Sequence, residues 1–167
     1  MIRVVESFLS PKLIDEILSD NARLKNDPSS WWTSHETWKA DIIKTSAVVF
    51  ARVLPREQAQ QIYTSMLTRN LVGISNQFPK VMSYLWHPLS YIPWHNDGHH
   101  QASATIYLNE VWDLDWGGYF LWKEGGEIRT TPPVFNRLIV SSENVEHSTT
   151  LTTVDAPLRQ TVQIFFK

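Results

Sequence analysis

The predicted fold and site depend on residues 91–100, which read YIPWHNDGHH. A run of β-forming residues here meets Asn96 and Gly98, and this pattern predicts a strand that ends in a turn. Side chains two positions apart on a strand point to the same face, so His95 and Asp97 would project side by side. An imidazole beside a carboxylate is a candidate pair of metal ligands.

A third candidate ligand lies far downstream, in the segment SENVEHS that contains His147. Two histidines and one carboxylate, with the other coordination positions open, are typical of non-haem Fe(II) oxygenases. Glu143 and Glu146 lie close to His147 and are alternative carboxylates. Asp97 is preferred because it would share a face with His95.

The other histidines have weaker claims to be ligands. His99 and His100 follow Gly98, where the strand is expected to turn, and we interpret them as residues at the mouth of the site. His35 and His87 lie in polar or proline-adjacent segments and have no partner in the pattern.

The strands predicted around these residues define the fold class. From residue 80 onward, short runs of β-forming residues recur between turn signals such as Gly117-Gly118 and Gly125-Gly126. They predict strands over residues 81–86, 91–95, 102–109, 119–122, 136–142 and 159–166. Many short strands at this spacing indicate an antiparallel sandwich or barrel.

The first half of the chain supplies the support for this sheet structure. A strand is predicted over 3–9, a helix from Ser10-Pro11 to about residue 26, and a second strand over 47–54. A second helix follows Pro55, and its expected buried stripe comprises Ala59, Ile62, Tyr63, Met66 and Asn70. The prediction is a mainly β fold with two flanking helices packed on the outside of one sheet.

The last predicted strand, residues 159–166, alternates between two kinds of face. Arg159, Thr161, Gln163 and Phe165 share one face, and the other face is apolar. Arg159 inside a barrel is costly unless it is paired, and a guanidinium suits a bidentate carboxylate. That carboxylate can belong to a ligand or to an internal salt bridge, for instance with Glu143.

The C-terminal half resembles the Fe(II)/2-oxoglutarate-dependent dioxygenases, and within them the prolyl 4-hydroxylase-like branch. The matching pieces, in order, are Tyr84, HND at 95–97, ATIYLN at 104–109, WGG at 116–118, FNRLIV at 135–140, EHS at 146–148 and RQT at 159–161. The match covers roughly residues 80 to 167. The pattern His-x-Asp alone is a weak signal, whereas the ordered set is specific. Residues 1–79 match only in their general arrangement, with helices that lead into the barrel.

The resemblance implies a double-stranded β-helix, a kind of jelly roll. It implies one dioxygenase domain over 1–167, with 1–79 as support and 80–167 as the core that carries the site. The implied Fe(II) ligands are His95, Asp97 and His147. The implied 2-oxoglutarate contacts are Arg159, Thr161, Tyr84 and Tyr107, with Phe165 lining the site.

The resemblance also implies a reaction, in which O2 and 2-oxoglutarate give succinate and CO2 while an unactivated C–H bond is hydroxylated. Ascorbate is a candidate reductant. The leading prime substrate is a prolyl residue in a peptide or protein, and the alternative is a free amino acid or small metabolite. A cupin-like metal-binding jelly roll without oxygenase activity, and a non-enzymatic jelly-roll module, are the rival interpretations.

Composition limits the other partners. The formal net charge is −2 and the pI is about 6.3, which gives no electrostatic attraction to nucleic acid or to an anionic membrane. The absence of cysteine excludes disulfides, thiolate zinc sites and iron–sulfur sites. No apolar run has the length of a signal peptide core or a membrane span, so we expect a cytoplasmic protein. The Trp-rich segment 29–41 is a candidate cover for the substrate mouth, and the sequence gives no indication of oligomeric state.

Overall fold

The computed structural model describes residues 1–33, 48–73, 77–98, 100–142 and 145–167. Its elements are β1 (Ile2–Val5), α1 (Pro11–Leu24), the 3-10 helix η1 (Pro28–Ser30), β2 (Trp32–Thr33), β3 (Val49–Val53), α4 (Arg56–Thr68), β4 (Lys80–Trp86), β5 (Ile92–His95), β6 (Ala102–Tyr107), η2 (Leu114–Trp116), β7 (Phe120–Glu124), β8 (Glu127–Thr131), β9 (Leu138–Ser142), β10 (His147–Thr149) and β11 (Arg159–Phe166).

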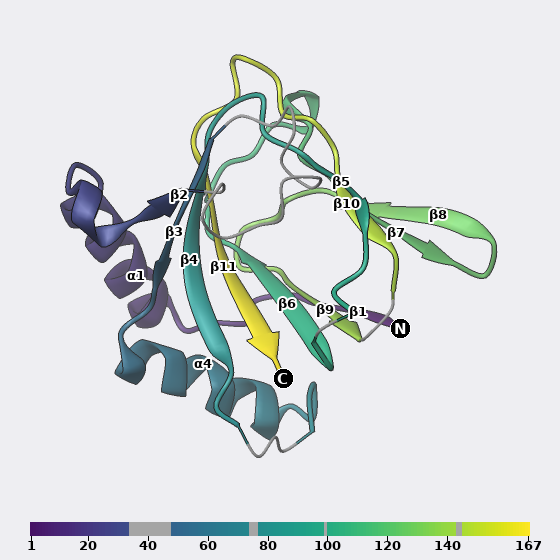
Figure 1. Cartoon of the computed structure of the whole chain (residues 1–167), viewed down its shortest axis with the longest axis horizontal. Helices are drawn as coiled ribbons and strands as arrows, with labels where there is room; N and C mark the ends of the chain where they lie inside the picture. Colours follow the sequence, from purple (N-terminus) through teal and green to yellow (C-terminus); the bar gives the residue numbers. More distant parts are fainter. Residues whose placement is uncertain (34–47, 74–76, 99, 143–144) are drawn as a thin grey trace.

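Two antiparallel sheets form the molecule (Figure 1). The larger sheet has seven strands in the order β1-β9-β6-β11-β4-β3-β2, and the smaller has four in the order β5-β10-β7-β8. Neighbours in each sheet are mostly far apart in the chain, which is the strand order of a jelly roll. The predicted double-stranded β-helix with flanking helices is therefore confirmed.

Strand β11 lies in the middle of the large sheet, paired with β4 on one side and β6 on the other. Its apolar face carries Val162, Ile164 and Phe166, which pack in one core cluster with residues of both helices. Its opposite face carries Arg159, Thr161, Gln163 and Phe165, and these line a cavity between the sheets. The alternation in the sequence predicted both faces correctly.

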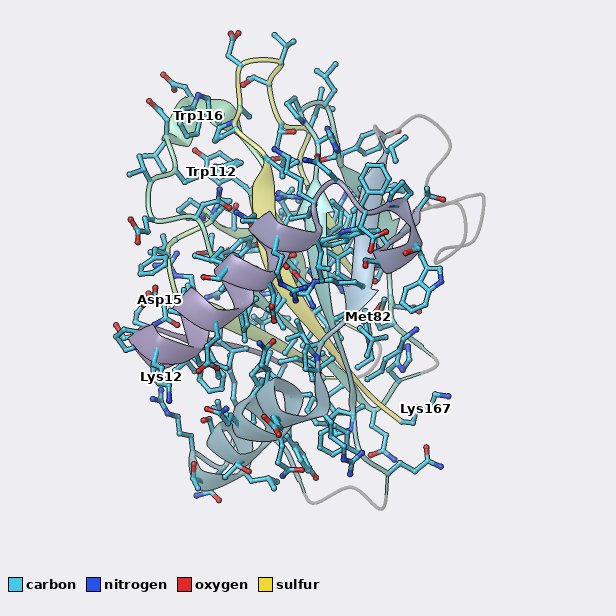
Figure 2. All side chains as sticks on the ribbon, turned by 90° about the vertical axis from the view of Figure 1, so that its left-hand side faces the viewer. Lys12, Asp15, Met82, Trp112, Trp116 and Lys167 are labelled. Carbon is cyan, nitrogen blue, oxygen red and sulfur yellow. The ribbon has the colours of Figure 1, made fainter. Side chains whose placement is uncertain are left out.

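Both helices cover the outer face of the large sheet, as predicted (Figure 2). Helix α1 begins at Pro11 because the side chain of Ser10 accepts a hydrogen bond from the backbone N–H of Leu13 (3.3 Å). The buried side of α4 contains the predicted Ala59, Ile62, Tyr63 and Met66 together with Gln58. Asn70 lies beyond the end of α4, with φ 52°.

Several boundaries differ from the prediction because single residues turn the chain. β1 ends at Val5, since Ser7 adopts φ 50°. Asn136 also adopts a positive φ (56°), so β9 begins two residues later than expected, at Leu138. The short strands β8 and β10 were not predicted; four of the five residues of β8 are exposed, which leaves no alternating pattern to detect.

The Trp-rich segment is described only in part. Its first residues form η1 and β2, and β2 pairs with β3. Residues 34–47 lie outside the described residues, so a cover over the substrate mouth stays a prediction. Neither of the described α-helices is long and apolar enough to cross a membrane.

Candidate metal centre

Two neighbouring strands of the small sheet bring the predicted ligands together. His95 is the last residue of β5 and His147 is the first residue of β10, and the two residues are partners in the antiparallel register. Asp97 lies two residues beyond β5. The sequence analysis treated His95 and Asp97 as two residues of one strand. Asp97 lies instead at the turn that follows β5.

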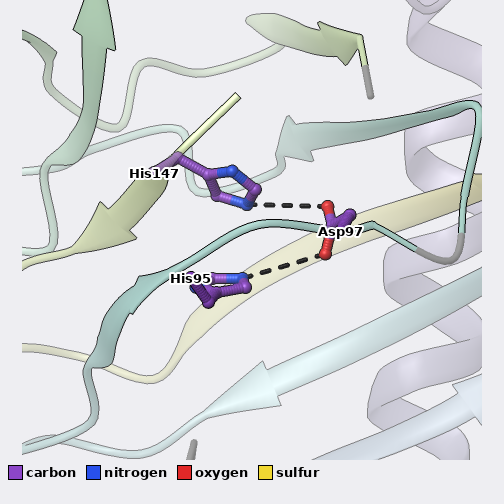
Figure 3. A group of neighbouring side chains, drawn as sticks. All are labelled: His95, Asp97 and His147. Carbon is purple, nitrogen blue, oxygen red and sulfur yellow. Dashed lines mark ion pairs between the residues drawn. The ribbon is translucent and has the colours of Figure 1, made fainter. Parts of the chain in front are cut away.

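The three side chains converge on one point (Figure 3). The Nε2 atom of His95 lies 3.8 Å from Oδ1 of Asp97, and Nε2 of His147 lies 3.5 Å from Oδ2. One ligand atom from each residue can be chosen so that all lie within 4.8 Å of one another. This spacing allows one metal ion to be held by all three.

Backbone carbonyls fix the tautomers of both histidines. The Nδ1 atom of His95 lies 2.8 Å from the carbonyl oxygen of Pro93, and that of His147 lies 2.8 Å from the carbonyl oxygen of Val145. A carbonyl oxygen can only accept a hydrogen bond, so the proton resides on Nδ1 and the lone pair on Nε2. Both lone pairs are then available where the three residues converge.

The surroundings of His147 favour its neutral form. Burial lowers the pKa of His147, and the nearby His95 lowers it further, although Asp97 acts in the opposite direction. The ring of Phe120 stacks on His147 with centroids 5.3 Å apart, which restrains the imidazole plane. A neutral, oriented imidazole is the state that binds a divalent metal ion.

The alternative ligands have other contacts. Glu146 forms an ion pair with Lys123 (2.8 Å), which holds its carboxylate away from the three ligands. The ring of His87 packs edge-on against Phe50, and His87 does not line the cavity. His100 does line it, as expected of a residue at the mouth. The remaining candidates, His35, His99 and Glu143, lie outside the described residues.

A cavity of about 860 Å³ separates the three ligands from the inner face of the large sheet. All of the residues that the sequence assigned to 2-oxoglutarate or to the lining border this cavity; they are Tyr84, Tyr107, Arg159, Thr161 and Phe165. The volume is within the range of cavities that bind small molecules.

Arg159 is a buried cation that faces the cavity, and only 2% of its surface is exposed. Its Nη1 donates to the carbonyl oxygen of Gly118 (2.9 Å), and its guanidinium lies over the ring of Trp86 (4.8 Å). Its Nε has no hydrogen-bond partner among the described residues. Burial lowers the pKa of Arg159 to about 10, so the group is still cationic at neutral pH. An anion in the cavity would complete its hydrogen bonding.

Thr161 stands next to Arg159 on the same face of β11 and has a proton to donate. Its Oγ1 accepts hydrogen bonds from Nε1 of Trp86 (2.9 Å) and from Nε2 of Gln163 (3.4 Å). Gln163 is itself held by Thr105, which donates to its Oε1 (2.8 Å). Because both acceptor positions of the hydroxyl are used, its O–H is directed elsewhere and can serve a ligand in the cavity.

The two tyrosines contribute phenol side chains to the cavity wall. Burial raises the pKa of Tyr107 to about 12, so its hydroxyl keeps its proton at neutral pH. The ring of Tyr84 stacks on Trp86, with centroids 5.7 Å apart, and its hydroxyl lies 3.8 Å from the sulfur of Met82. Both side chains lie where they can contact a ligand bound to Arg159.

Two residues that support Arg159 were missed as functional residues. Trp86 was interpreted only as a strand residue, and Gly118 only as part of a turn signal and of a matching motif. Gly118 adopts φ +72°, and a Cβ at this position would lie 2.5 Å from Nη1 of Arg159. The Gly117-Gly118 pair between two predicted strands was the available signal, since adjacent glycines mark unusual backbone or close approach.

The chain has the double-stranded β-helix fold of the 2-oxoglutarate- and Fe(II)-dependent oxygenases, and within them that of the prolyl 4-hydroxylases. It resembles a prolyl 4-hydroxylase of Pseudomonas putida with TM-score 0.74 and 17% identity, over 99% of this chain and 91% of the other. It also resembles a prolyl hydroxylase of Trichoplax adhaerens, solved with a peptide fragment of the oxygen degradation domain of hypoxia inducible factor (TM-score 0.76, 13% identity, 99% and 82% covered).

A third similar structure is the collagen prolyl hydroxylase of Paramecium bursaria Chlorella virus-1 in complex with 2-oxoglutarate (TM-score 0.66, 12% identity, 98% and 94% covered). No protein-family model and no curated protein matches the sequence. At these identities the likeness is one of fold, and the chemistry has to be argued from the residues of this chain.

Proposed function

We propose that this protein is an Fe(II)- and 2-oxoglutarate-dependent dioxygenase that hydroxylates an unactivated C–H bond and releases succinate and CO2. One observation carries the proposal. The cavity has three convergent metal ligands on one wall and, on the other, a buried arginine with an unmade hydrogen bond. The shared fold with oxygenases of this class supports it.

The ligands of the metal are Nε2 of His95, Nε2 of His147 and the carboxylate of Asp97. Three ligands leave coordination positions open for a cosubstrate and O2, and histidine nitrogens with a carboxylate suit Fe(II). When bound, Fe(II) and 2-oxoglutarate supply the oxygen-activating chemistry. The carbonyls of Pro93 and Val145 keep both imidazoles in the tautomer that binds metal.

The cosubstrate side of the cavity is organised by β11. Arg159 receives the far carboxylate of 2-oxoglutarate through charge-assisted hydrogen bonds, and the hydroxyl of Thr161 donates to the same group. Tyr84 and Tyr107 would contact the cosubstrate from the neighbouring strands β4 and β6. Arg159 and Thr161 have no such function in a cupin-like metal-binding protein or a non-enzymatic jelly roll, and this distinguishes the proposal from those rivals.

The proposed prime substrate is a prolyl residue in a peptide or protein. Support comes from three of the similar structures, which are prolyl hydroxylases, one of them solved with a peptide. A free amino acid or small metabolite is the alternative. Formation of succinate in the presence of O2, 2-oxoglutarate and ascorbate as reductant would be compared for proline-containing peptides and for free amino acids. Turnover stimulated only by free amino acids would overturn the peptide assignment.

The test of the oxygenase proposal is the anaerobic visible spectrum on addition of Fe(II) and then 2-oxoglutarate. We expect a metal-to-ligand charge-transfer band only when both are present. His147→Ala should abolish the band, because two remaining ligands hold a labile divalent ion poorly. His87→Ala is the matched control, since His87 packs against Phe50 outside the cavity. A folded wild-type protein that gives no band would favour the cupin-like interpretation.

A further inference from the structure

The charged residues that line the cavity are unevenly distributed in sign. Among the described residues, Asp97 is the only acidic one in the lining, whereas Arg159, Lys80 and Lys167 are basic. The whole chain carries a formal net charge of −2, so this positive character is local and does not follow from the composition. It requires an explanation in terms of what the cavity binds.

The two lysines lie at the opposite end of the cavity from Arg159. Trp86 is the register partner of Arg159, and Lys80, at the other end of β4, is the partner of Phe165. Lys80 and Trp86 are six positions apart on β4, which corresponds to about 20 Å. Lys167 follows β11 at the same end. A carboxylate held by Arg159 is therefore out of reach of Lys80.

The proposed cofactors do not neutralise Lys80. The two carboxylates of 2-oxoglutarate and that of Asp97 balance the charges of Fe(II) and Arg159. Lys80 is exposed, and no ion pair of the described residues involves it. Lys123 on β7 differs, since it lies over the ring of Trp94 and is already paired with Glu146. Within the described part of the chain, Lys80 is thus a cation at the mouth without a counter-charge.

We propose that the mouth of the cavity selects a negatively charged prime substrate, namely a peptide with an acidic residue beside the target proline, whose carboxylate pairs with Lys80. This inference rests on the proposed function. On the other wall of the cavity, Trp94 is 39% exposed and offers an aromatic surface to the apolar part of such a peptide. The rim would therefore combine one ion pair with one apolar contact.

The expected preference is modest because the pair is exposed. Surface ion pairs contribute about 1 kcal/mol or less, which corresponds to about a five-fold difference in affinity between peptides of opposite charge. Salt screens such pairs, so the preference should shrink as the ionic strength rises from about 0.05 M to 0.5 M.

The test uses two fluorescent peptides with a central proline, one flanked by glutamates and the other by lysines. Fluorescence anisotropy would measure binding to protein loaded with Fe(II) and 2-oxoglutarate without O2, so that no turnover occurs. Wild type should bind the acidic peptide about five-fold more tightly, and Lys80→Glu should reverse the order. Lys12→Glu makes the same charge change on α1, distant from Lys167 (Figure 2), and should leave the preference intact.

Equal binding of the two peptides, tighter binding of the basic one, or binding of neither would overturn the inference. The charge-transfer spectrum is recorded on the same samples and tests the proposed function separately. A normal band without charge preference would remove only the inference. A charge preference without the band would remove the oxygenase proposal and leave an anion-selecting mouth.

Discussion

Arg52 and Arg159 are buried to almost the same extent, with 4% and 2% of their surfaces exposed, yet their surroundings differ. Arg52 belongs to β3 and contacts α1. Arg159 belongs to β11 and faces the cavity. Among the described residues neither forms an ion pair with a carboxylate.

The Nε and Nη2 donors of Arg52 both find an acceptor within the protein. Its Nε and Nη2 both donate to Oδ1 of Asn21 (3.1 and 2.9 Å), and Ser83 donates to the same oxygen (3.0 Å). Asn21 donates in turn to Gln160 (2.9 Å). Burial lowers the pKa of Arg52, while the nearby Asp20 raises it. The result is a polar network that fastens α1 to the sheet and lines no described cavity.

Arg159, in contrast, has a donor without an acceptor among the described residues. Its Nη1 reaches one backbone carbonyl, its Nε reaches no acceptor among the described residues, and a large cavity lies in front of it. Unsatisfied buried donors are rare in proteins, and each calls for a ligand or another explanation. Burial alone does not separate a structural arginine from a binding arginine, whereas incomplete hydrogen bonding toward a cavity does.

Arg159→Met should have the largest effect on ligand binding. We expect 2-oxoglutarate to bind about 100-fold more weakly, a loss of about 3 kcal/mol, because a buried charge-assisted contact is removed. The stability of the ligand-free protein should stay equal or rise, since methionine removes a buried unpaired cation and keeps most of the volume. Titration by the charge-transfer band and thermal unfolding without ligand would measure the two quantities. Unchanged 2-oxoglutarate affinity would show that the assignment of Arg159 is wrong.

Gly118→Ala should weaken 2-oxoglutarate binding by an intermediate amount. The new Cβ would lie 2.5 Å from Nη1 of Arg159 and must displace the guanidinium. We expect a loss of about 2 kcal/mol in 2-oxoglutarate affinity, roughly 30-fold, with some loss of stability from the positive φ. The same titration measures it.

Gly125→Ala provides the control for this substitution. Gly125 also has a positive φ (62°), but a Cβ added there would have no described atom within 4 Å beyond its chain neighbours. Gly125→Ala should therefore lose stability from the positive φ, as Gly118→Ala does, and leave the affinity for 2-oxoglutarate unchanged. Equal losses of affinity in both variants would mean that Gly118 acts through backbone strain alone.

The sequence predicted the site where the relevant pattern is local. Alternation along residues 159–166 assigned Arg159 and Thr161 to one face and the apolar residues to the other, because a strand has a fixed period of two. The same period placed His95 and Asp97 close together, although Asp97 lies past the end of β5. A turn that continues the direction of a strand keeps its neighbouring side chains close.

Features that depend on contacts between distant segments were not predicted. The pairing of β10 with β5, which brings His147 to His95, involves only three residues of β10 and has no periodicity of its own. Arg52 and Asn21 meet because α1 packs on the sheet, and nothing in either segment indicates the other. Helix α1 was predicted from Ser10-Pro11 at its start, and this signal says nothing about the polar Asn21 on its buried side.

Arg52→Met should have the smallest effect, and it should change the stability of the protein instead of its affinity for 2-oxoglutarate. Oδ1 of Asn21 would keep the hydrogen bond from Ser83, so we expect a loss of about 1 kcal/mol in the free energy of unfolding. The affinity for 2-oxoglutarate should not change, because Arg52 does not border the cavity. Urea unfolding and the charge-transfer titration measure the two effects.

The variant that combines Arg52→Met with Arg159→Met should show the two losses independently, since the networks share no hydrogen-bond partner among the described residues. If Arg52→Met weakened the binding of 2-oxoglutarate as much as Arg159→Met does, incomplete hydrogen bonding toward a cavity would not be what distinguishes the two arginines.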